Sequence, residues 1–250
     1  MADTEPHLLR RGDALLAADT RAWGLPTWTR WWLLGLPFVA CLALILAAPH
    51  PRLYHALIEE DHVIEWAQFA AILAASIVFG LAGFHAWRNG RRGLAILFAL
   101  VAVGSFVVAG EEISWGQRIL GLQTPEALDE INHQGETNIH NINGVQKIFN
   151  LGEMLVGLYG FGVPILLSIA AGRRLVRRSI DRLLVPPLAF SALFFLPFLY
   201  RAFRAFFLPE AGERITEFGE VPELTLYVGI LLTGAVILRS LRRARPVEAA

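Results

Sequence analysis

The sequence predicts an all-α integral membrane protein: a six-helix bundle with both chain ends in the cytoplasm and a polar cap on the extracytoplasmic face. Hydrophobic residues make up 55% of the 250 residues, whereas soluble domains have about 45–50%. Charged residues make up only 18%, compared with about 25% in soluble domains. The mean hydropathy is +0.49, and the apolar residues come in six long runs. The single cysteine, Cys41, excludes an intramolecular disulfide and a cysteine-rich zinc site.

Each of the six runs is close to the length of about 20 apolar residues that crosses a bilayer as a helix. The third run is short and the sixth begins among glutamates, but a helix still crosses when its polar ends reach the headgroups. An arm over residues 1–30 precedes the six-span domain 31–238, and a basic tail over 239–250 follows it. The predicted spans are 31–48, 64–86, 94–110, 150–171, 183–200 and 221–238, and the long outer connection is 111–149.

The basic residues predict the orientation of these spans. Of the 22 basic residues, 16 lie in the N-terminal arm, the second and fourth connections and the C-terminal tail. The positive-inside rule therefore places both termini in the cytoplasm of a protein of the inner (plasma) membrane. An even number of spans independently requires both termini to lie on one side of the membrane. The first span reads as an uncleaved anchor, because the arm before it is too long for a signal peptide. The lipid bilayer is the predicted partner, and a net charge of zero gives no indication of nucleic acid.

The acidic residues are distributed in the opposite way. Of the 22 acids, 16 lie in the outer connections or at the span ends beside them, together with five of the seven histidines. A solvated outer surface is one explanation. Acids contribute little to orientation, however, so three polar clusters that adjoin apolar spans predict a functional site on the outer face.

The first cluster lies at the start of the second span. Asp61, Glu65 and Gln68 are spaced i, i+4 and i+7, so they share one face of a helix. Asp61 has an alternative role as an N-cap, in which its carboxylate accepts hydrogen bonds from the first turn. Glu65 lies deeper, and an acid inside a span indicates function by default.

The second cluster, 110–118, ends the third span. Adjacent carboxylates at a membrane boundary repel each other, and such a pair suits general acid–base catalysis when its two environments differ. A continuing helix would align Glu111 with Ser114 and Arg118. We therefore expect Glu111, Glu112 and Arg118 to form one hydrogen-bonded unit. The alternative is a structural ion pair between Glu111 and Arg118 that fastens the helix end.

The third cluster, 132–141, lies in the outer connection. Before it, Thr124, Pro125 and Glu126 predict an N-cap and the start of a short helix that ends near Ile131. In a helix, Glu136 and His140 would be i, i+4 neighbours, a spacing from which two side chains can hold one metal ion. We expect the segment to fold back over the bundle onto the other clusters and to bury the side chains of Ile131, Ile139 and Ile142 there. The alternative is an amide-rich loop that lies on the headgroups.

Two smaller features complete the outer face. Arg201 and Arg204 lie at the end of the fifth span. They either bind a phosphate or carboxylate of an anionic substrate or extend their guanidinium groups to the membrane–water interface. The second interpretation is preferred. Glu217, Glu220 and Glu223 precede the sixth span three residues apart and are explained by solvation alone. The supporting polar residues of the predicted site are Glu65, Ser114, Gln117, Asn132, Gln134, Glu136, Asn138 and Asn141.

The second and third clusters resemble those of a group of uncharacterised bacterial multi-pass membrane proteins. The resemblance rests on residues 110–118 and 132–141, with the Glu60-Asp61 and Glu65 entry to the second span, and covers roughly residues 55–150. It implies no activity. The sequence fails the E-E-x-x-x-R motif of CAAX-type glutamic peptidases, because Gly116 occupies the arginine position. It also lacks the H-x-x-x-H pair of alkaline-ceramidase-like hydrolases.

These clusters predict a metal-assisted hydrolase or transferase that acts on a lipid or lipid-linked substrate at the outer face. A divalent ion, with zinc as the first choice, would generate hydroxide near neutral pH, while Glu112 moves protons and Arg118 orients the acids. The predicted metal ligands are His62, His133 and His140, completed by Glu111 or Asp61. The competing hypothesis is a non-enzymatic subunit whose polar cap docks a protein or a lipid headgroup. A transporter ranks third, because charges deep within the spans are scarce.

Overall fold

The computed structural model describes residues 5–58, 62–132, 135–139, 142, 144–169, 182–208 and 217–243, with the backbone alone for 5–9 and Arg118. All regular segments in this part of the chain are helical, apart from one isolated antiparallel bridge between Asn132 and Ile142. The helices are α1 (Glu5–Ala22), α2 (Thr29–Ala47), α3 (Pro51–Ile58), α4 (Val63–Arg88), α5 (Arg92–Glu112), α6 (Gln117–Leu120), α7 (Glu126–Asp129), α8 (Val145–Ser168), α10 (Ser191–Phe207) and α12 (Glu220–Arg243), with 3-10 turns η1 (Ser114–Gly116), η2 (Arg182–Leu184) and η3 (Leu188–Phe190).

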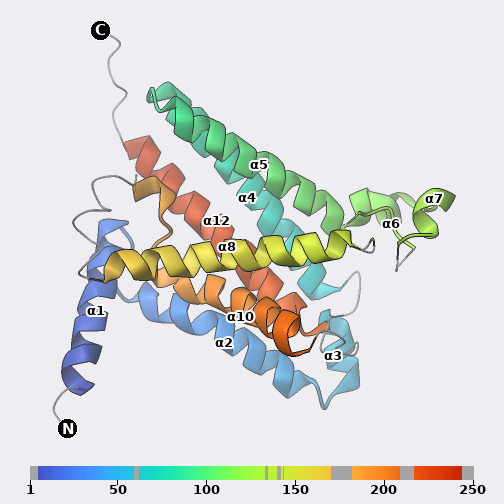
Figure 1. Cartoon of the computed structure of the whole chain (residues 1–250), viewed down its shortest axis with the longest axis horizontal. Coiled ribbons are helices and arrows are strands. Elements are labelled where there is room, and N and C mark those ends of the chain that lie inside the picture. Colours follow the sequence, from blue (N-terminus) through green and yellow to red (C-terminus); the bar gives the residue numbers. More distant parts are fainter. Residues whose placement is uncertain are drawn as a thin grey trace.

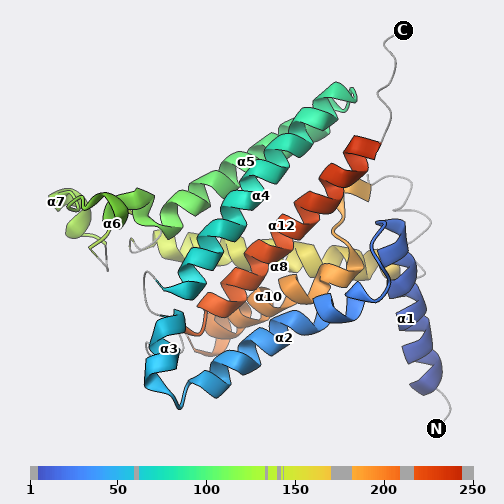
Figure 2. The ribbon, with the colours of Figure 1, turned by 180° about the vertical axis from the view of Figure 1, so that it is seen from behind.

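Six segments are long and apolar enough to cross a membrane, so the predicted number of spans is confirmed. They are Thr29–Ala47, Pro51–Arg88, Arg92–Glu112, Val145–Ser168, Arg182–Phe207 and Glu220–Arg243. Successive spans run in opposite directions between the two ends of the bundle (Figure 1). One end, the terminal end, gathers α1, the α4–α5 turn and the last turns of α8 and α12. The other, the cap end, gathers α3, α6, α7 and the first turns of α8 and α12 (Figures 1 and 2).

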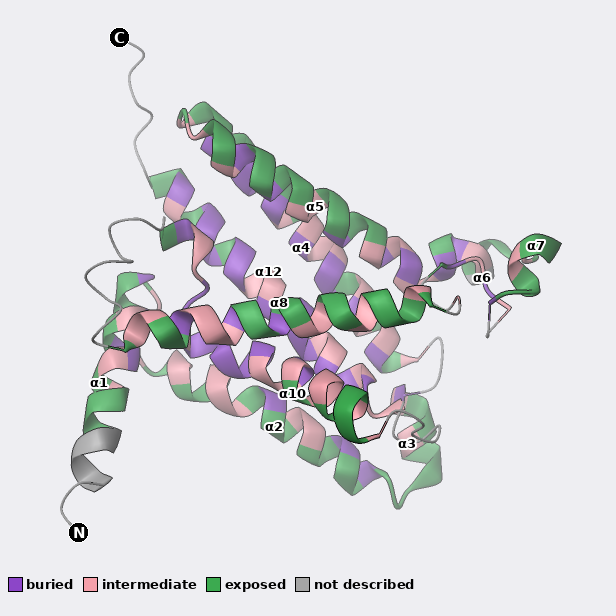
Figure 3. Ribbon diagram, in the orientation of Figure 1, coloured by how far each residue is buried: buried purple, intermediate pink, exposed green. Residues whose placement is uncertain are grey.

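Helix α12 is the centre of the bundle. It packs against α4 on one side and α10 on the other, while α5 covers α4 and α8 covers α10. Accordingly, 61% of the residues in the apolar stretch of α12 are buried inside the protein, compared with 17% in α2 and in α8. The outer helices instead expose apolar residues along one side (Figure 3), among them Leu100, Val103 and Phe106 of α5. Such a surface is suited to contact with lipid chains rather than water.

Glycine allows the closest helix contacts. A Cβ on Gly160 of α8 would lie 2.2 Å from the ring of Phe194 of α10, and one on Gly229 of α12 would lie 3.0 Å from the same ring. On the other side of α12, a Cβ on Gly234 would lie 2.9 Å from the ring of Phe79 of α4. Small residues let helix backbones approach in a membrane, where van der Waals packing holds helices together. Phe194 thus fills the space between α8, α10 and α12.

The N-terminal helix α1 packs on the terminal end of the bundle. Leu16 and Thr20 are buried there, and the carboxylate of Asp19 accepts a hydrogen bond of 2.8 Å from the backbone N–H of Leu188 in η3. Burial raises the pKa of the Asp19 carboxyl, although this hydrogen bond and the nearby Arg182 act in the opposite direction. The guanidinium of Arg182 lies 4.5 Å from the ring centroid of Trp23. The described part of the arm, from Glu5 onward, is therefore folded against the bundle.

The role of Phe194 predicts the effect of adding one methyl group to α8. We expect Gly160→Ala to destabilise the protein by about 1–3 kcal/mol, because the buried ring must leave its position. The measurement is the thermal unfolding midpoint in detergent. Gly162→Ala is the matched control on the same helix, since a Cβ there would lie 3.7 Å from Cδ1 of Leu158, an ordinary van der Waals contact. Equal losses of stability in the two variants would contradict the role of Phe194.

Candidate functional site

The adjacent carboxyl groups of Glu111 and Glu112 face different surroundings. Both residues lie in the last turn of α5, and the helix ends directly after them. Ser114, Trp115 and Gly116 have φ angles of +46°, +55° and +78°. Two of these three are not glycine, and such backbone conformations are uncommon and concentrate at functional sites. The expected continuous helix from Glu111 through Ser114 to residue 118 is therefore wrong. Glu111 instead joins the cap, residues 113–142, and Glu112 joins the interior of the bundle.

The turn after α5 fixes Glu111 through Trp115. The indole ring folds back onto Gly110, where any Cβ would lie 2.8 Å from the ring. The indole Nε1–H donates to Glu111 Oε1 at 2.7 Å, and the backbone N–H of Ile139 donates to Glu111 Oε2 at 2.7 Å. The carboxyl group, whose residue is 2% exposed, thus ties the end of α5 to the returning segment of the outer connection.

A second set of contacts joins the same two motifs. The hydroxyl of Ser114 donates to Glu136 Oε2 at 2.7 Å and accepts from Asn138 Nδ2 at 3.1 Å. Asn132 Nδ2 donates to the backbone carbonyl of Asn138 at 2.8 Å. All four of these residues are buried. The polar side chains of the second and third clusters therefore bind one another, and the expected folding back is confirmed for the contacts with Glu111 and Ser114.

Three details of the cap differ from expectation. Residues 135–139 are not helical, so the i, i+4 geometry proposed for Glu136 is wrong, since its carboxylate binds Ser114 instead. Thr124 is not an N-cap: α7 begins at Glu126, and the Thr124 hydroxyl bonds the backbone carbonyl of Gly135 and accepts from Gln117 Nε2. Ile139, expected to be buried, is 46% exposed.

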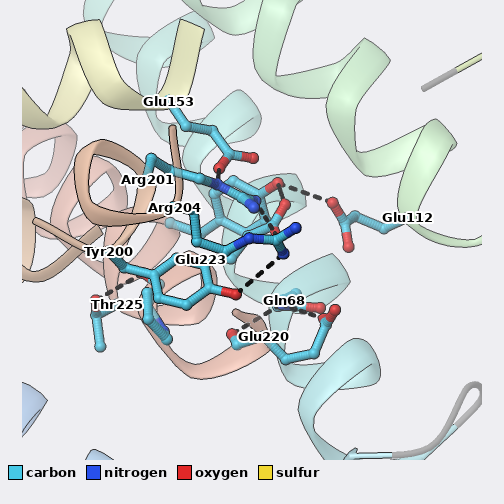
Figure 4. Close-up of polar contacts among 11 residues, drawn as sticks. Gln68, Glu112, Glu153, Tyr200, Arg201, Arg204, Glu220, Glu223 and Thr225 are labelled. Carbon is cyan, nitrogen blue, oxygen red and sulfur yellow. Dashed lines mark hydrogen bonds and ion pairs between the residues drawn. The ribbon is translucent and has the colours of Figure 1, made fainter. Parts of the chain in front are cut away.

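A second and deeper group of polar side chains lies inside the bundle at the cap end (Figure 4). This polar network comes from α4, α5, α8, α10 and α12, and it includes charged residues inside the membrane-spanning segments. Its members are Gln68, Glu112, Glu153, Arg201, Glu220, Glu223 and Tyr227. It contains four carboxyl groups and one guanidinium group, so acids outnumber bases.

Arg201 is the cation of the network. Its Nε donates to Glu153 Oε2, and its Nη2 donates to Glu223 Oε2 at 3.1 Å. The three side chains are 15%, 12% and 17% exposed. The preferred interpretation of Arg201, extension to the interface, is therefore wrong: it binds carboxylates, and they belong to the protein. Arg204, one turn further along α10, lies 3.5 Å from the hydroxyl of Tyr200.

Tyr227 links the two ends of the network. Its hydroxyl oxygen lies 2.8 Å from Glu112 Oε1 and 2.7 Å from Glu223 Oε1. Nearer the cap end, Gln68 Nε2 donates to the backbone carbonyl and to the carboxylate of Glu220, both at 3.0 Å. Gln68 is fully buried, and its Oε1 has no hydrogen-bond partner among the described residues. The explanation of Glu220 and Glu223 by solvation is thus wrong.

The buried faces turn apolar toward the terminal end. On α10, the residue two turns from Arg201 is Phe194, and on α4 the face that begins at Gln68 continues through Ile72 and Ala75 to Phe79. Phe194 and Phe79 are the rings that pack against the glycines of α12. The buried faces beside the network are therefore polar at the cap end and apolar toward the terminal end.

The predicted metal centre stays a prediction. Among the described residues, no three acid, histidine or cysteine side chains gather closely enough to hold a metal ion. Of the proposed ligands, only His62 and Glu111 are described. Asp61, His133, Gln134, His140 and Asn141 lie outside the described residues, as does the side chain of Arg118, so the Arg118 unit also stays a prediction.

No family model, curated protein or solved structure matches the chain. The resemblance to bacterial multi-pass membrane proteins consequently stays a prediction.

The ion pairs of Arg201 predict a large effect of losing its charge. We expect Arg201→Gln to destabilise the protein by about 3–5 kcal/mol, because the carboxylates of Glu153 and Glu223 lose their partner in a poorly hydrated place. Adding Glu153→Gln to this variant should restore part of the loss. Unfolding in detergent measures both effects. Arg204→Gln on the same helix is the control, and a loss there as large as in Arg201→Gln would contradict the prediction.

The cap contacts predict a local effect of removing one hydroxyl group. We expect Ser114→Ala to cost about 1–3 kcal/mol, because buried Glu136 and Asn138 lose a hydrogen-bond partner. Hydrogen exchange at the Ile139 amide should become faster as the segment loosens. In the control, Ser240→Ala removes a hydroxyl that bonds only within its own helix, and unchanged exchange at Ile139 in Ser114→Ala would show that the cap does not depend on this contact.

Proposed function

We propose that this protein is an acid–base enzyme, a hydrolase or group transferase, that acts on the polar part of a lipid or lipid-linked substrate at the extracytoplasmic face. The orientation is supported by the position of α1, the α4–α5 turn and the last turns of α12, which are all at the terminal end (Figure 1) and all contain arginines. By the positive-inside rule that end faces the cytoplasm. The cap and the polar network then belong to the outer half of the membrane.

The position of Tyr227 between two carboxyl groups carries the proposal. A phenol has one hydrogen, so it donates to only one of two acceptors. With Glu112 and Glu223 both within 2.8 Å of the oxygen, a second hydrogen is needed for both contacts to be hydrogen bonds. One of the two carboxyl groups therefore acts as an acid that donates to Tyr227.

Arg201 distinguishes the two carboxyl groups. Glu223 accepts from its guanidinium through Oε2, and such a contact favours the ionised form. The shared hydrogen accordingly belongs on Glu112, which donates to Tyr227, which in turn donates to Glu223. A neutral acid and an ionised acid in neighbouring but different environments is the arrangement used for general acid–base catalysis.

In this proposal each residue has one task. A water molecule, or the hydroxyl of an acceptor in a transferase, attacks the carbonyl carbon of the substrate, and Glu112 protonates the leaving group as its bond to that carbon breaks. Ionised Glu223 accepts the proton that the attacking oxygen loses, and this proton returns to Glu112 through the hydroxyl of Tyr227. Arg201 holds Glu223 in its ionised form. Because acids outnumber bases and Arg201 is occupied by Glu153 and Glu223, a neutral group such as an ester or amide suits the site better than a phosphate. The zinc hypothesis depends on His133 and His140, and no step here depends on it.

The two other hypotheses are supported less well. Docking through the polar cap would need its motif side chains at the surface, whereas Glu111, Ser114, Glu136 and Asn138 are buried and bind one another. Transport is favoured by the charged residues within the spans, which often mark ion and proton pathways. The apolar packing of Phe194 and Phe79 separates these residues from the terminal end, however, so a site served from one face is the simpler account.

The proposal predicts an infrared signature. Wild-type protein in lipid should show the carbonyl band of a carboxylic acid at neutral pH, and Glu112→Gln should remove it. Tyr227→Phe should shift the band, because the acid loses its acceptor. Glu130→Gln, which changes an exposed carboxyl of the cap, is the matched control and should leave the band unchanged. Absence of any Glu112-dependent band would refute the assignment of the proton.

Activity is tested with the same variants in proteoliposomes. Incubation with a bacterial lipid extract, followed by mass spectrometry, should show products with wild type and with Glu130→Gln but not with Glu112→Gln. A pH-sensitive dye inside the vesicles reports transport in parallel. Internal pH changes that depend on Glu112, without lipid products, would replace the enzyme with a proton-coupled transporter.

A further inference from the structure

A pocket of about 300 Å³ opens at the terminal end, far along α12 from the polar network. Its size lies at the lower end of the range of roughly 300–1,000 Å³ found for small-ligand sites. Its lining combines apolar side chains with arginines. Its lining residues are Val78 of α4 and Ala235, Leu238, Arg239, Arg242 and Arg243 of α12.

The guanidinium groups of Arg239 and Arg243, two of the residues that line this pocket, approach each other beside Gly24. Gly24, in the turn between α1 and α2, has a φ of +69°, and a Cβ there would lie 3.3 Å from Arg243 Nη1 and 3.6 Å from Arg239 Nη2. Both cationic nitrogens are therefore within 4 Å of a single point. Two like charges at this separation repel each other, and an anion between them removes the repulsion.

No carboxylate within the described part of the chain forms an ion pair with these three arginines. Other arginines do have such partners: Arg30 pairs with Asp13 at 2.8 Å, and Arg201 pairs with Glu153 and Glu223. Arg88 and Arg92 of the neighbouring turn lie over the rings of Phe84 and Trp87. The lining of the pocket thus combines closely spaced cations with apolar side chains.

We propose that this pocket binds the phosphate group of an anionic phospholipid from the leaflet at the terminal end. Guanidinium groups bind phosphate oxygens through paired, charge-assisted hydrogen bonds, which Arg239 and Arg243 provide. Arg242 adds charge at the rim, and an acyl chain lies against Val78 and Leu238. Basic pockets between membrane helices on the cytoplasmic side suit anionic headgroups in this way. The inference is independent of the chemistry at Glu112.

The test compares lipid binding by two variants of equal charge. Arg239→Gln/Arg243→Gln removes the converging pair, and Arg88→Gln/Arg92→Gln removes two arginines at the same end but outside the pocket. Each protein is placed in phosphatidylcholine nanodiscs, with and without phosphatidylglycerol or cardiolipin. Thermal unfolding and native mass spectrometry then report stabilisation and the number of retained lipids.

We expect the anionic lipids to raise the unfolding midpoint of wild type and of the Arg88/Arg92 variant. In the Arg239/Arg243 variant the apparent affinity should fall by about tenfold or more, with an unchanged midpoint in phosphatidylcholine alone as evidence of intact folding. Equal losses in both double variants would overturn the pocket, because they would indicate a diffuse surface effect. A third arm uses inorganic phosphate in phosphatidylcholine nanodiscs; stabilisation by phosphate as strong as by lipid would assign the pocket to a free anion and overturn the lipid.

Discussion

The contacts of one guanidinium group hold the cap end of the bundle together. Arg201 of α10 binds Glu153 of α8 and Glu223 of α12, so a single side chain connects three membrane helices. Charges in such a place are costly unless they are paired, and these pairs determine how α8, α10 and α12 are rotated about their axes. Tyr227 and Glu112 extend the connection to α5, and Gln68 extends it to α4 through Glu220. Five helices thereby share one set of polar contacts.

The cap depends on a different interaction, although it begins one residue away. Glu111 accepts from Trp115 and from the backbone of Ile139, so the outer connection returns to the end of α5. The left-handed turn at Ser114 and Trp115 makes this return sharp. The two distinctive motifs of the sequence have a clear structural role in this light, since their polar residues satisfy one another away from water.

The membrane class and the number of spans could be predicted from composition and apolar runs alone, because these depend on no tertiary contact. The folding back of the outer connection onto the end of α5 could also be predicted, but not the backbone of Ile139 as the partner of Glu111, because the sequence favours Arg118 or a metal ion for that carboxyl group. Arg201, Glu220 and Glu223 were misjudged, because each lies near a span end, where a charged side chain can reach the headgroups. Only the packing of α8 against α10 reveals that Glu153 lies beside Arg201. The signal in the sequence was the occurrence of both charges within apolar segments.

The positions of Glu111 and Glu112 on α5 have a mechanical consequence. Successive residues of an α-helix point in directions about 100° apart, and the two carboxyl groups are attached to the same last turn. Any rotation of that turn about the helix axis therefore moves both carboxyl groups at once. Release of the Ile139 amide from Glu111 would therefore change the position of Glu112 relative to Tyr227 without a separate signal. A ligand that lifts the cap would in this way alter the environment of a carboxyl group it never touches.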